Sequence, residues 1–205
     1  MKYIVKQCEP VFFTTWKAQA NANWQPEYSN MPTDIKQQLK DALLDEQGWI
    51  CCYCEQEITP DDSHIEHFRP QSDPNCDPLD YSNLLGSCQK QRRKGEPLHC
   101  GSLKADWFDR NLLISPLNPS CESRFVFLGN GEIQAKDAND QAAKETIQRL
   151  GLNIPKLIEM RKKVIEVFLD ELLTDVEVAN LVSTYLVKKA KKYSPFWSTI
   201  HYLFS

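Results

Sequence analysis

The sequence contains no long hydrophobic run. None of its stretches approaches the roughly 20 consecutive apolar residues that a membrane-spanning helix needs. The opening segment, Met1 to Lys6, also contains no apolar run of the kind found in a secretion signal. Internal repeats and low-complexity tracts are absent, and the 41% hydrophobic and 25% charged content excludes wholesale disorder. These absences predict a globular protein of the cytoplasm that has no membrane partner.

A strong charge of either sign is missing as well. The formal net charge of −4 excludes a chain that binds nucleic acid simply by being basic overall. Basic residues nevertheless gather locally, and a local patch matters more for phosphate binding than the total. One cluster comprises Lys90, Arg92, Arg93 and Lys94, and another comprises Lys188, Lys189, Lys191 and Lys192. The first is interpreted either as a nucleic-acid contact or as a solvated loop, and the second as a solvated surface.

The order of the expected elements predicts an α+β fold that is mostly helical. Apolar residues at helical spacing predict a helix over 34–46, and a glycine turn predicts a β-hairpin over 124–135. Further helices are expected over 137–150, over the apolar positions from Leu157 to Leu172, and over 175–192. We therefore divide the chain into an N-terminal helical segment (1–48), a metal-stapled core (49–115), a β-hairpin (116–136) and a C-terminal helical region (137–205).

Cysteine is abundant, with eight residues in the chain, and six of them lie between positions 51 and 100. In a reducing cytosol, such clustering favours metal binding over disulfides. Cys51 and Cys54 form a C-x-x-C knuckle, whose thiolates can take adjacent positions on zinc. Four cysteines leave no open position, so the predicted zinc is structural. The predicted zinc ligands are Cys51, Cys54, Cys88 and Cys100, with Cys52 as a competitor in the knuckle and His99 as an alternative to Cys100.

The motifs around these cysteines resemble those of HNH endonucleases, in the order C-x-x-C, acidic-His, Asn-Leu-x-x-x-Cys and Cys-x-x-x-Lys. The variant Cys-Tyr-Cys-Glu, His-Ile-Glu-His-Phe-Arg-Pro and His-Cys-Gly-x-x-Lys is similar to the HNH proteins of retron and Septu anti-phage defence, the PtuB type. Residues 146–153 also look like the tail of that family, so the resemblance covers most of the chain. It implies a ββα-metal (HNH) core, with a β-hairpin packed on a helix, flanked here by N- and C-terminal helices.

Phosphodiester hydrolysis needs an activated water and stabilisation of charge on the phosphate. His67 is the candidate general base, because imidazole titrates near neutral pH. Glu66 is the candidate ligand for a catalytic Mg²⁺ or Mn²⁺, since these ions prefer carboxylate oxygen. The resemblance implies that Asn83 orients His67 through a hydrogen bond, as the middle residue of the family does.

The second ligand of the catalytic metal is where this sequence departs from the family pattern. Many HNH enzymes carry Asn or His directly after the last cysteine, and here that position is Gly101. His64 stands two residues before Glu66, so on a strand both side chains would face the same side. We rank His64 ahead of His99 as the replacement ligand. Arg69 and Lys104 are predicted to contact phosphate, together with the cluster from Lys90 to Lys94.

The leading functional hypothesis is a metal-dependent nuclease that acts as the toxic effector of a retron or Septu defence system. The resemblance implies an ABC/SMC-like ATPase of the PtuA type as partner, and also a retron reverse transcriptase with its RNA–DNA product. The alternative is a non-catalytic zinc-binding adaptor that recognises nucleic acid or protein, which Gly101 in place of a ligand supports. A mechanism that uses external water leaves both DNA and RNA open as substrates. Sequence preference, activation trigger and stoichiometry also stay open.

Overall fold

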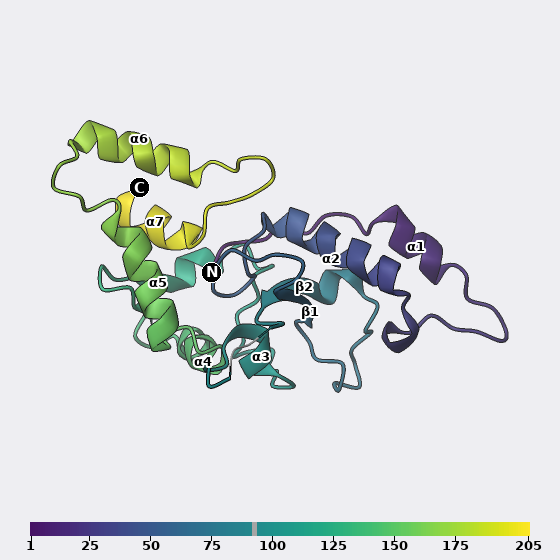
Figure 1. Cartoon of the computed structure of the whole chain (residues 1–205). Helices are drawn as coiled ribbons and strands as arrows, with labels where there is room; N and C mark the ends of the chain where they lie inside the picture. The colour runs from purple at the N-terminus through teal and green to yellow at the C-terminus, as the bar shows by residue number, and fades with distance from the viewer. Residues whose placement is uncertain (92–93) are drawn as a thin grey trace.

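The computed structural model describes residues 1–91 and 94–205, so the predicted contacts Arg92 and Arg93 lie outside the described residues. Helices and strands alternate irregularly along the chain (Figure 1), which confirms the expected mixture of α and β structure. The helices are α1 (Val11–Lys17), α2 (Thr33–Gln47), α3 (Cys100–Lys104), α4 (Gln141–Arg149), α5 (Pro155–Glu166), α6 (Asp175–Leu186) and α7 (Trp197–Phe204). The strands are β1 (Ser63–His67), β2 (Leu84–Cys88), β3 (Phe125–Phe127) and β4 (Ile133–Ala135).

An antiparallel pair of strands, β1 and β2, lies near the middle of the molecule between α2 and α3 (Figure 1). Ser63 pairs with Cys88 at one end of the ladder and His67 with Leu84 at the other. Gln47 at the end of α2 ties that helix to β2, since its side-chain amide bonds both the N–H and the C=O of Gly86. Strand β2 also contacts α3. The chain thus builds two strands and a short helix around the predicted site.

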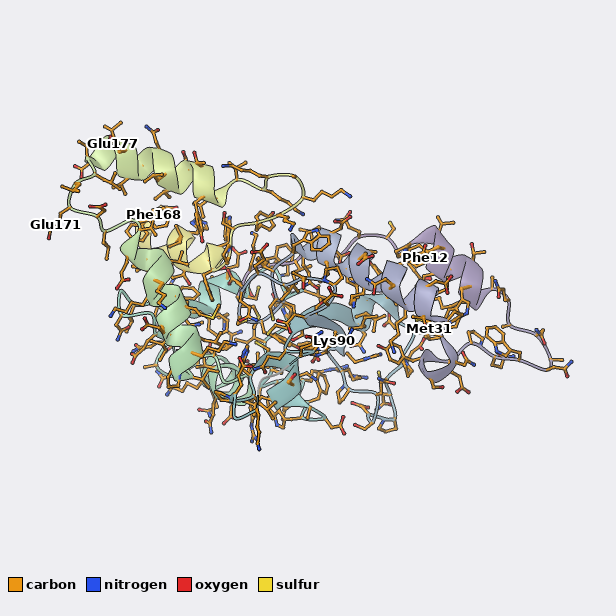
Figure 2. The ribbon with its side chains drawn as sticks, viewed as in Figure 1. Phe12, Met31, Lys90, Phe168, Glu171 and Glu177 are labelled. Carbon is orange, nitrogen blue, oxygen red and sulfur yellow. The ribbon has the colours of Figure 1, made fainter. Side chains whose placement is uncertain are left out.

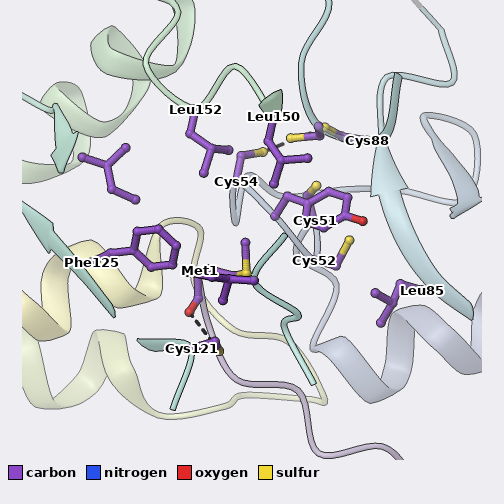
Figure 3. Packing of buried hydrophobic residues seen from close by; sticks show 14 of the residues in the cluster. Met1, Cys51, Cys52, Cys54, Leu85, Cys88, Cys121, Phe125, Leu150 and Leu152 are labelled. Atoms are coloured by element: carbon purple, nitrogen blue, oxygen red, sulfur yellow. Dashed lines mark hydrogen bonds between the residues drawn. The ribbon is translucent and has the colours of Figure 1, made fainter. Parts of the chain in front are cut away.

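The largest buried cluster contains the cysteine knuckle, and Figure 3 shows Leu150, Leu152 and Phe125 close to the thiols. These three residues come from the C-terminal half, so that half covers the metal-binding segment. A separate cluster joins α5, α6 and α7, with Phe168 beneath α6 and Glu177 on its outer side (Figure 2). No helix in the described ranges 1–91 and 94–205 is both long and apolar enough to cross a lipid bilayer.

The C-terminal helices differ from the expected ones. The helix expected to reach Leu172 ends at Glu166, and Leu172 is 89% exposed. The helix expected over 175–192 ends at Leu186, where the Trp197 indole donates a hydrogen bond to the Leu186 carbonyl. Beyond it, Ala190 and Lys191 take left-handed conformations that reverse the chain. Helix α7 was not predicted. Tertiary contacts therefore override helix propensity in this region.

Substitution of Asp140, the residue that caps the N-terminus of α4, tests how much this cap contributes to stability. Its carboxylate caps α4 by accepting the Ala143 N–H and also pairs with Arg124. Asp140→Ala is expected to lower the free energy of unfolding by about 1–2 kcal/mol, because an N-cap is lost. Asp140→Asn keeps a capping oxygen but loses the charge of a partly buried, two-point pair with Arg124, so its loss should be smaller than that of Asp140→Ala. Equal losses in urea unfolding would show that the cap is not the main contribution.

Candidate active site and metal centre

The four cysteines predicted as zinc ligands come together in the core. The Sγ atoms of Cys51, Cys54, Cys88 and Cys100 all lie within 4.8 Å of one another, and all four residues are buried. Cys54 and Cys88 have their sulfur atoms 3.9 Å apart. Tetrahedral zinc with Zn–S bonds of about 2.3 Å sets its sulfurs about 3.8 Å apart, which fits this spacing. The cluster could therefore hold a structural metal ion.

The two alternative ligands suggested by the sequence, Cys52 and His99, lie at different places relative to the cluster. Cys52 is buried but does not belong to the group of converging sulfurs. The Nδ1 atom of His99 lies 3.2 Å from Cys100 Sγ and 3.6 Å from Cys88 Sγ, so the ring neighbours the cluster. An imidazole N–H placed there can donate to a thiolate, which is how residues around a metal site orient its ligands.

Burial opposes the ionisation of cluster thiols. It raises the pKa of Cys54 and of Cys100, because a thiolate is costly in an apolar core. Without a cation these groups would remain thiols at neutral pH. A bound Zn²⁺ reverses that preference by stabilising the thiolates directly.

The cysteine knuckle also reaches the second candidate site through Tyr53. A tight turn brings Glu55 N–H to the Cys51 carbonyl at 3.0 Å, with Glu55 in a left-handed conformation. Tyr53 projects from this turn into the core, where its hydroxyl donates to Glu66 Oε1 at 3.1 Å. One residue of the knuckle thus helps to fix the carboxylate of β1.

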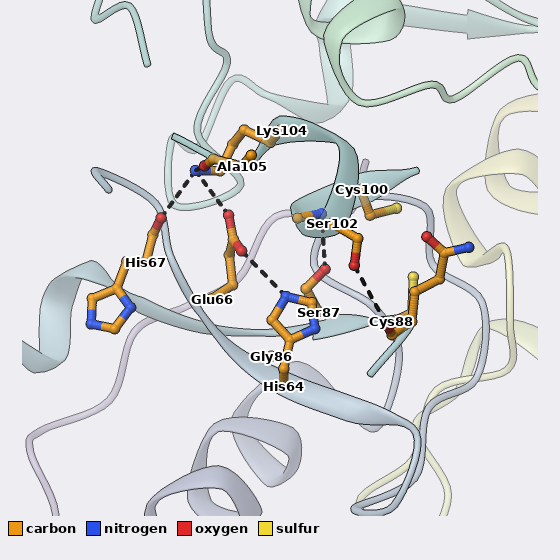
Figure 4. A network of polar contacts seen from close by, with 12 residues as sticks. His64, Glu66, His67, Gly86, Ser87, Cys88, Cys100, Ser102, Lys104 and Ala105 are labelled. Carbon is orange, nitrogen blue, oxygen red and sulfur yellow. Dashed lines mark hydrogen bonds and ion pairs between the residues drawn. The ribbon is translucent and has the colours of Figure 1, made fainter. Parts of the chain in front are cut away.

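The carboxylate of Glu66 is held on one side and turned toward a histidine on the other (Figure 4). Its Oε1 atom receives the Tyr53 hydroxyl and lies 3.0 Å from Lys104 Nζ. Its Oε2 atom lies 3.4 Å from Nε2 of His64, two residues earlier on the same face of β1. The His64 side chain is 28% exposed and that of Glu66 only 7%. The pair therefore offers an oxygen and a nitrogen that face each other near the surface.

Gly101 lies directly against the ends of the Glu66 and His64 side chains. A Cβ atom at Gly101 would lie 2.3 Å from Glu66 Oε2 and 2.8 Å from His64 Nε2. No real Cβ tolerates such distances, so a larger residue would displace the two side chains. The ends of Glu66 and His64 fill the space that a side chain at position 101 would need. The observed positions of the Glu66 and His64 side chains therefore require glycine at position 101.

His67 occupies the other face of β1, because side chains alternate along a strand. Its Nε2 lies 3.0 Å from the Pro78 carbonyl, and its Nδ1 lies 3.4 Å from the Gln71 amide. The ring of Tyr28 meets it edge-on at 4.6 Å. Burial lowers the pKa of His67 despite the raising effect of the Pro78 carbonyl, so the neutral ring is favoured. With Nε2–H donated to Pro78, Nδ1 is the nitrogen that can accept a proton.

Asn83 contributes to the position of His67 through the main chain. Its side chain accepts the Arg69 N–H at 2.8 Å and donates to the Arg69 carbonyl at 2.9 Å. Its own carbonyl accepts the N–H of Phe68 at 3.0 Å. Asn83 thus fixes the two residues that follow His67, whereas the His67 ring itself is held by Pro78. The sequence contains no signal that singles out Pro78 for this role.

Lys104, which was predicted to contact phosphate, is buried instead of lying at the surface. The residue is 2% exposed, and its ammonium group contacts Glu66 and donates to the carbonyls of His67, Phe68 and Ala105. With these partners it has no free donor to offer a phosphate, so its role is to support Glu66. Lys90 and Lys94 are exposed as expected.

The Arg69 side chain makes its polar contacts within the loop that follows β1. Its guanidinium donates to the Asn75 carbonyl, lies 3.6 Å from Asp73 and stacks over Phe108. Its side chain is 25% exposed, so one face remains accessible. Tyr53 was missed by the sequence reasoning, although its place inside the C-x-x-C knuckle marks it as fixed by the cysteines.

Comparison with known proteins gives two relatives, while no family model matches the chain. The "Retron Vc95 putative HNH endonuclease" of Vibrio cholerae serotype O1 biovar El Tor is 37% identical over 139 residues, 64% of this chain and 65% of that protein. The "Retron Ec83 putative HNH endonuclease" of Escherichia coli is 27% identical over 204 residues, 80% of this chain and 79% of that protein. The chain thus spans slightly less than two thirds of the first relative. These matches confirm the predicted resemblance to retron-associated HNH endonucleases.

Proposed function

We propose that this chain, as a relative of two proteins named retron HNH endonucleases, is a metal-dependent endonuclease that hydrolyses phosphodiester bonds in nucleic acid. Strands β1 and β2 with helix α3 would form its ββα-metal core. The four-cysteine cluster would hold a structural Zn²⁺ that fixes this core. The cytoplasm is the proposed location, since reduced thiols are maintained there.

The convergence of Glu66 and His64 over Gly101 carries this proposal. The two donor atoms lie 3.4 Å apart. Neighbouring ligands on an octahedral Mg²⁺ with bonds of about 2.1 Å are about 3 Å apart, so a small adjustment brings both onto one ion. Their chemistry, one carboxylate oxygen and one imidazole nitrogen, suits Mn²⁺ or Mg²⁺. His64 thus takes the role that Gly101 cannot fill.

The reaction follows from the groups around this pair. A bound divalent ion supplies Lewis acidity and offsets charge on the phosphate and on the leaving oxygen. Tyr53 and Lys104 hold Glu66 Oε1, which leaves Oε2 free to act as a ligand. The Nδ1 atom of His67 accepts a proton from the attacking water, while the Pro78 carbonyl fixes the ring. The water oxygen bonds to phosphorus, the bond to the leaving oxygen breaks, and that oxygen takes a proton from solvent.

The names of the relatives suggest the biological setting. We propose that the nuclease is the toxic effector of a retron anti-phage system. A PtuA-like ABC/SMC-type ATPase and the retron reverse transcriptase with its RNA–DNA product are the proposed partners. Septu-type systems are the related setting that the motif variant suggests. Both DNA and RNA are retained as candidate substrates.

The proposal is tested by the substitution Gly101→Ala. The added Cβ would meet the Glu66 carboxylate, which Tyr53 and Lys104 hold, so the carboxylate must shift and the ligand pair is pushed apart. A circular dichroism spectrum equal to that of the control shows that the fold survives the change. Metal-dependent cleavage should fall about 10- to 100-fold, the range found when groups that orient metal ligands are disturbed. The measurement is cleavage of plasmid DNA and structured RNA by the purified chain, alone and with its proposed partners, against Mn²⁺ concentration.

Gly129→Ala is the matched control, because a Cβ at Gly129 meets nothing within 4 Å. It should cleave as the unaltered chain does. Gly101→Ala activity equal to that of the control would contradict the placement of the metal between Glu66 and His64. If the unaltered chain with its partners binds nucleic acid but never cleaves it, the adaptor hypothesis replaces the nuclease.

A further inference from the structure

A groove of about 340 Å³ lies between α2 and β1, beside the candidate active site. His64 lines it, and the His64 ring lies 3.4 Å from the Glu66 carboxylate. Tyr28 lines it too, and its ring touches that of His67. The groove is therefore bordered by one proposed metal ligand and by a ring that contacts the proposed base.

Three lysines line this groove. Lys36 and Lys40 stand four residues apart on one face of α2, about 6 Å along the helix axis. Lys90 enters from the segment that follows β2, and Figure 2 places it below α2 in the middle of the molecule. The other lining residues include no carboxylate: they are Tyr28, Thr33, Gln37, Ser63, His64 and Ile65.

These cations have little to neutralise them. Within residues 1–91 and 94–205, neither Lys36 nor Lys90 forms an ion pair with a carboxylate, and Lys36 lies over the Tyr28 ring at 4.3 Å. Lys40 donates to the Pro60 carbonyl. Burial lowers the pKa of Lys40, and the nearby charge of Lys90 lowers the same pKa further. The carboxylates of Asp41 and Asp61 act in the opposite direction. Like charges converge here at a cost that a bound anion would offset.

We propose that this groove holds backbone phosphates of the substrate strand next to the bond that is cut, with Lys36, Lys40 and Lys90 as the contacts. This inference rests on the proposed nuclease function and extends it to the path of the strand. Lysine contacts to phosphate position a strand without reading its bases. The hydroxyl of Thr33 and the amide of Gln37 add neutral donors to the groove. Binding through this groove is therefore independent of base sequence.

The test compares two double variants that change the charge equally. Lys36→Gln with Lys90→Gln removes the two exposed groove lysines and leaves the buried Lys40 in place. Lys162→Gln with Lys163→Gln removes two exposed lysines of α5, outside the groove. Binding of labelled single-stranded DNA and RNA oligonucleotides to the zinc-loaded chain is measured at several salt concentrations, with no added Mg²⁺ or Mn²⁺.

The groove variant is expected to bind about tenfold or more weakly, and its salt slope should fall by about 0.7 for each lost phosphate contact on a single strand. The α5 variant should bind as the unaltered chain does. Equal binding by both variants would overturn the groove assignment. Cleavage by the unaltered chain would in that case still support the proposed nuclease function.

A mononucleotide that binds as tightly as the oligonucleotides would overturn the assignment of the groove to a nucleic-acid strand. Weakened binding by the groove variant, with no cleavage by the unaltered chain and its partners, would overturn the nuclease but support the groove.

Discussion

A His67→Ala variant is expected to cleave nucleic acid about 10²- to 10⁴-fold more slowly than the unaltered chain, the usual contribution of a positioned general base. The expected loss follows from the Nδ1 atom, which is left as a proton acceptor when Nε2 bonds the Pro78 carbonyl. Glu66 and His64 lie on the other face of β1, so metal affinity should change little. The measurements are the single-turnover cleavage rate and its dependence on Mn²⁺ concentration.

His201→Ala is the control for this substitution. His201 is an exposed residue of α7 whose ring meets that of Trp197 edge to face, and it takes no part in the candidate site. Because His67 is buried against Tyr28, His67→Gln serves as a second variant whose amide can still donate to Pro78. Both His67 variants should retain zinc and the circular dichroism spectrum of the fold. A variant that stays folded and cleaves at the rate of the control would remove His67 from the mechanism.

Loss of the structural metal is expected to unfold the core around the cysteine cluster. Binding of structural Zn²⁺ contributes about 10–16 kcal/mol in zinc-finger peptides. The whole stability of a domain is typically about 5–15 kcal/mol, so the core cannot absorb such a loss. Cys54→Ser, or treatment with a strong zinc chelator, should abolish bound zinc and the cooperative unfolding transition. Metal content is measured by mass spectrometry and unfolding by circular dichroism in urea.

Cys8→Ser provides the control, because Cys8 is exposed and lies outside the cluster. This variant should carry one zinc ion per chain and unfold at the same urea concentration as the unaltered chain. If Cys54→Ser retained stoichiometric zinc, the metal would have other ligands. If it lost zinc but unfolded like the Cys8 control, the cluster would not be what stabilises the core.

The Cys51–Cys54 knuckle could be predicted from its spacing, whereas Cys88 and Cys100 were chosen as the second pair with Cys52 and His99 left as alternatives. Two thiols separated by two residues converge on one side of a turn, and a second pair must then close the tetrahedron. The shared side of His64 and Glu66 could likewise be predicted from the two-residue period of a strand. The hairpin at β3 and β4 and the helix α2 followed from turn residues and apolar spacing in the same way.

Other features depend on contacts between distant segments and could not be predicted locally. Lys104 stands at the motif position at which we predicted a phosphate contact. Its ammonium group instead contacts the Glu66 carboxylate and nearby carbonyls, and the side chain is buried. The sequence contains no local signal that brings Lys36 and Lys40 of α2 beside β1. Helix α6 stops at Leu186 although good helix formers follow, since Trp197 takes the carbonyl that the helix would use.

The hydrogen bond from Tyr53 to Glu66 gives the two proposed metal sites a thermodynamic link. Tyr53 lies between two of the cysteines that would bind zinc, so the position of its hydroxyl depends on how firmly the knuckle is closed. Filling the zinc site is then expected to raise affinity for the second metal by ordering its carboxylate ligand. Linkage makes the effect reciprocal, so the second metal must strengthen zinc binding by the same factor. Oxidation of one knuckle thiol is therefore expected to weaken both proposed sites in a single event, which would make the state of the cysteines a control on the proposed nuclease activity.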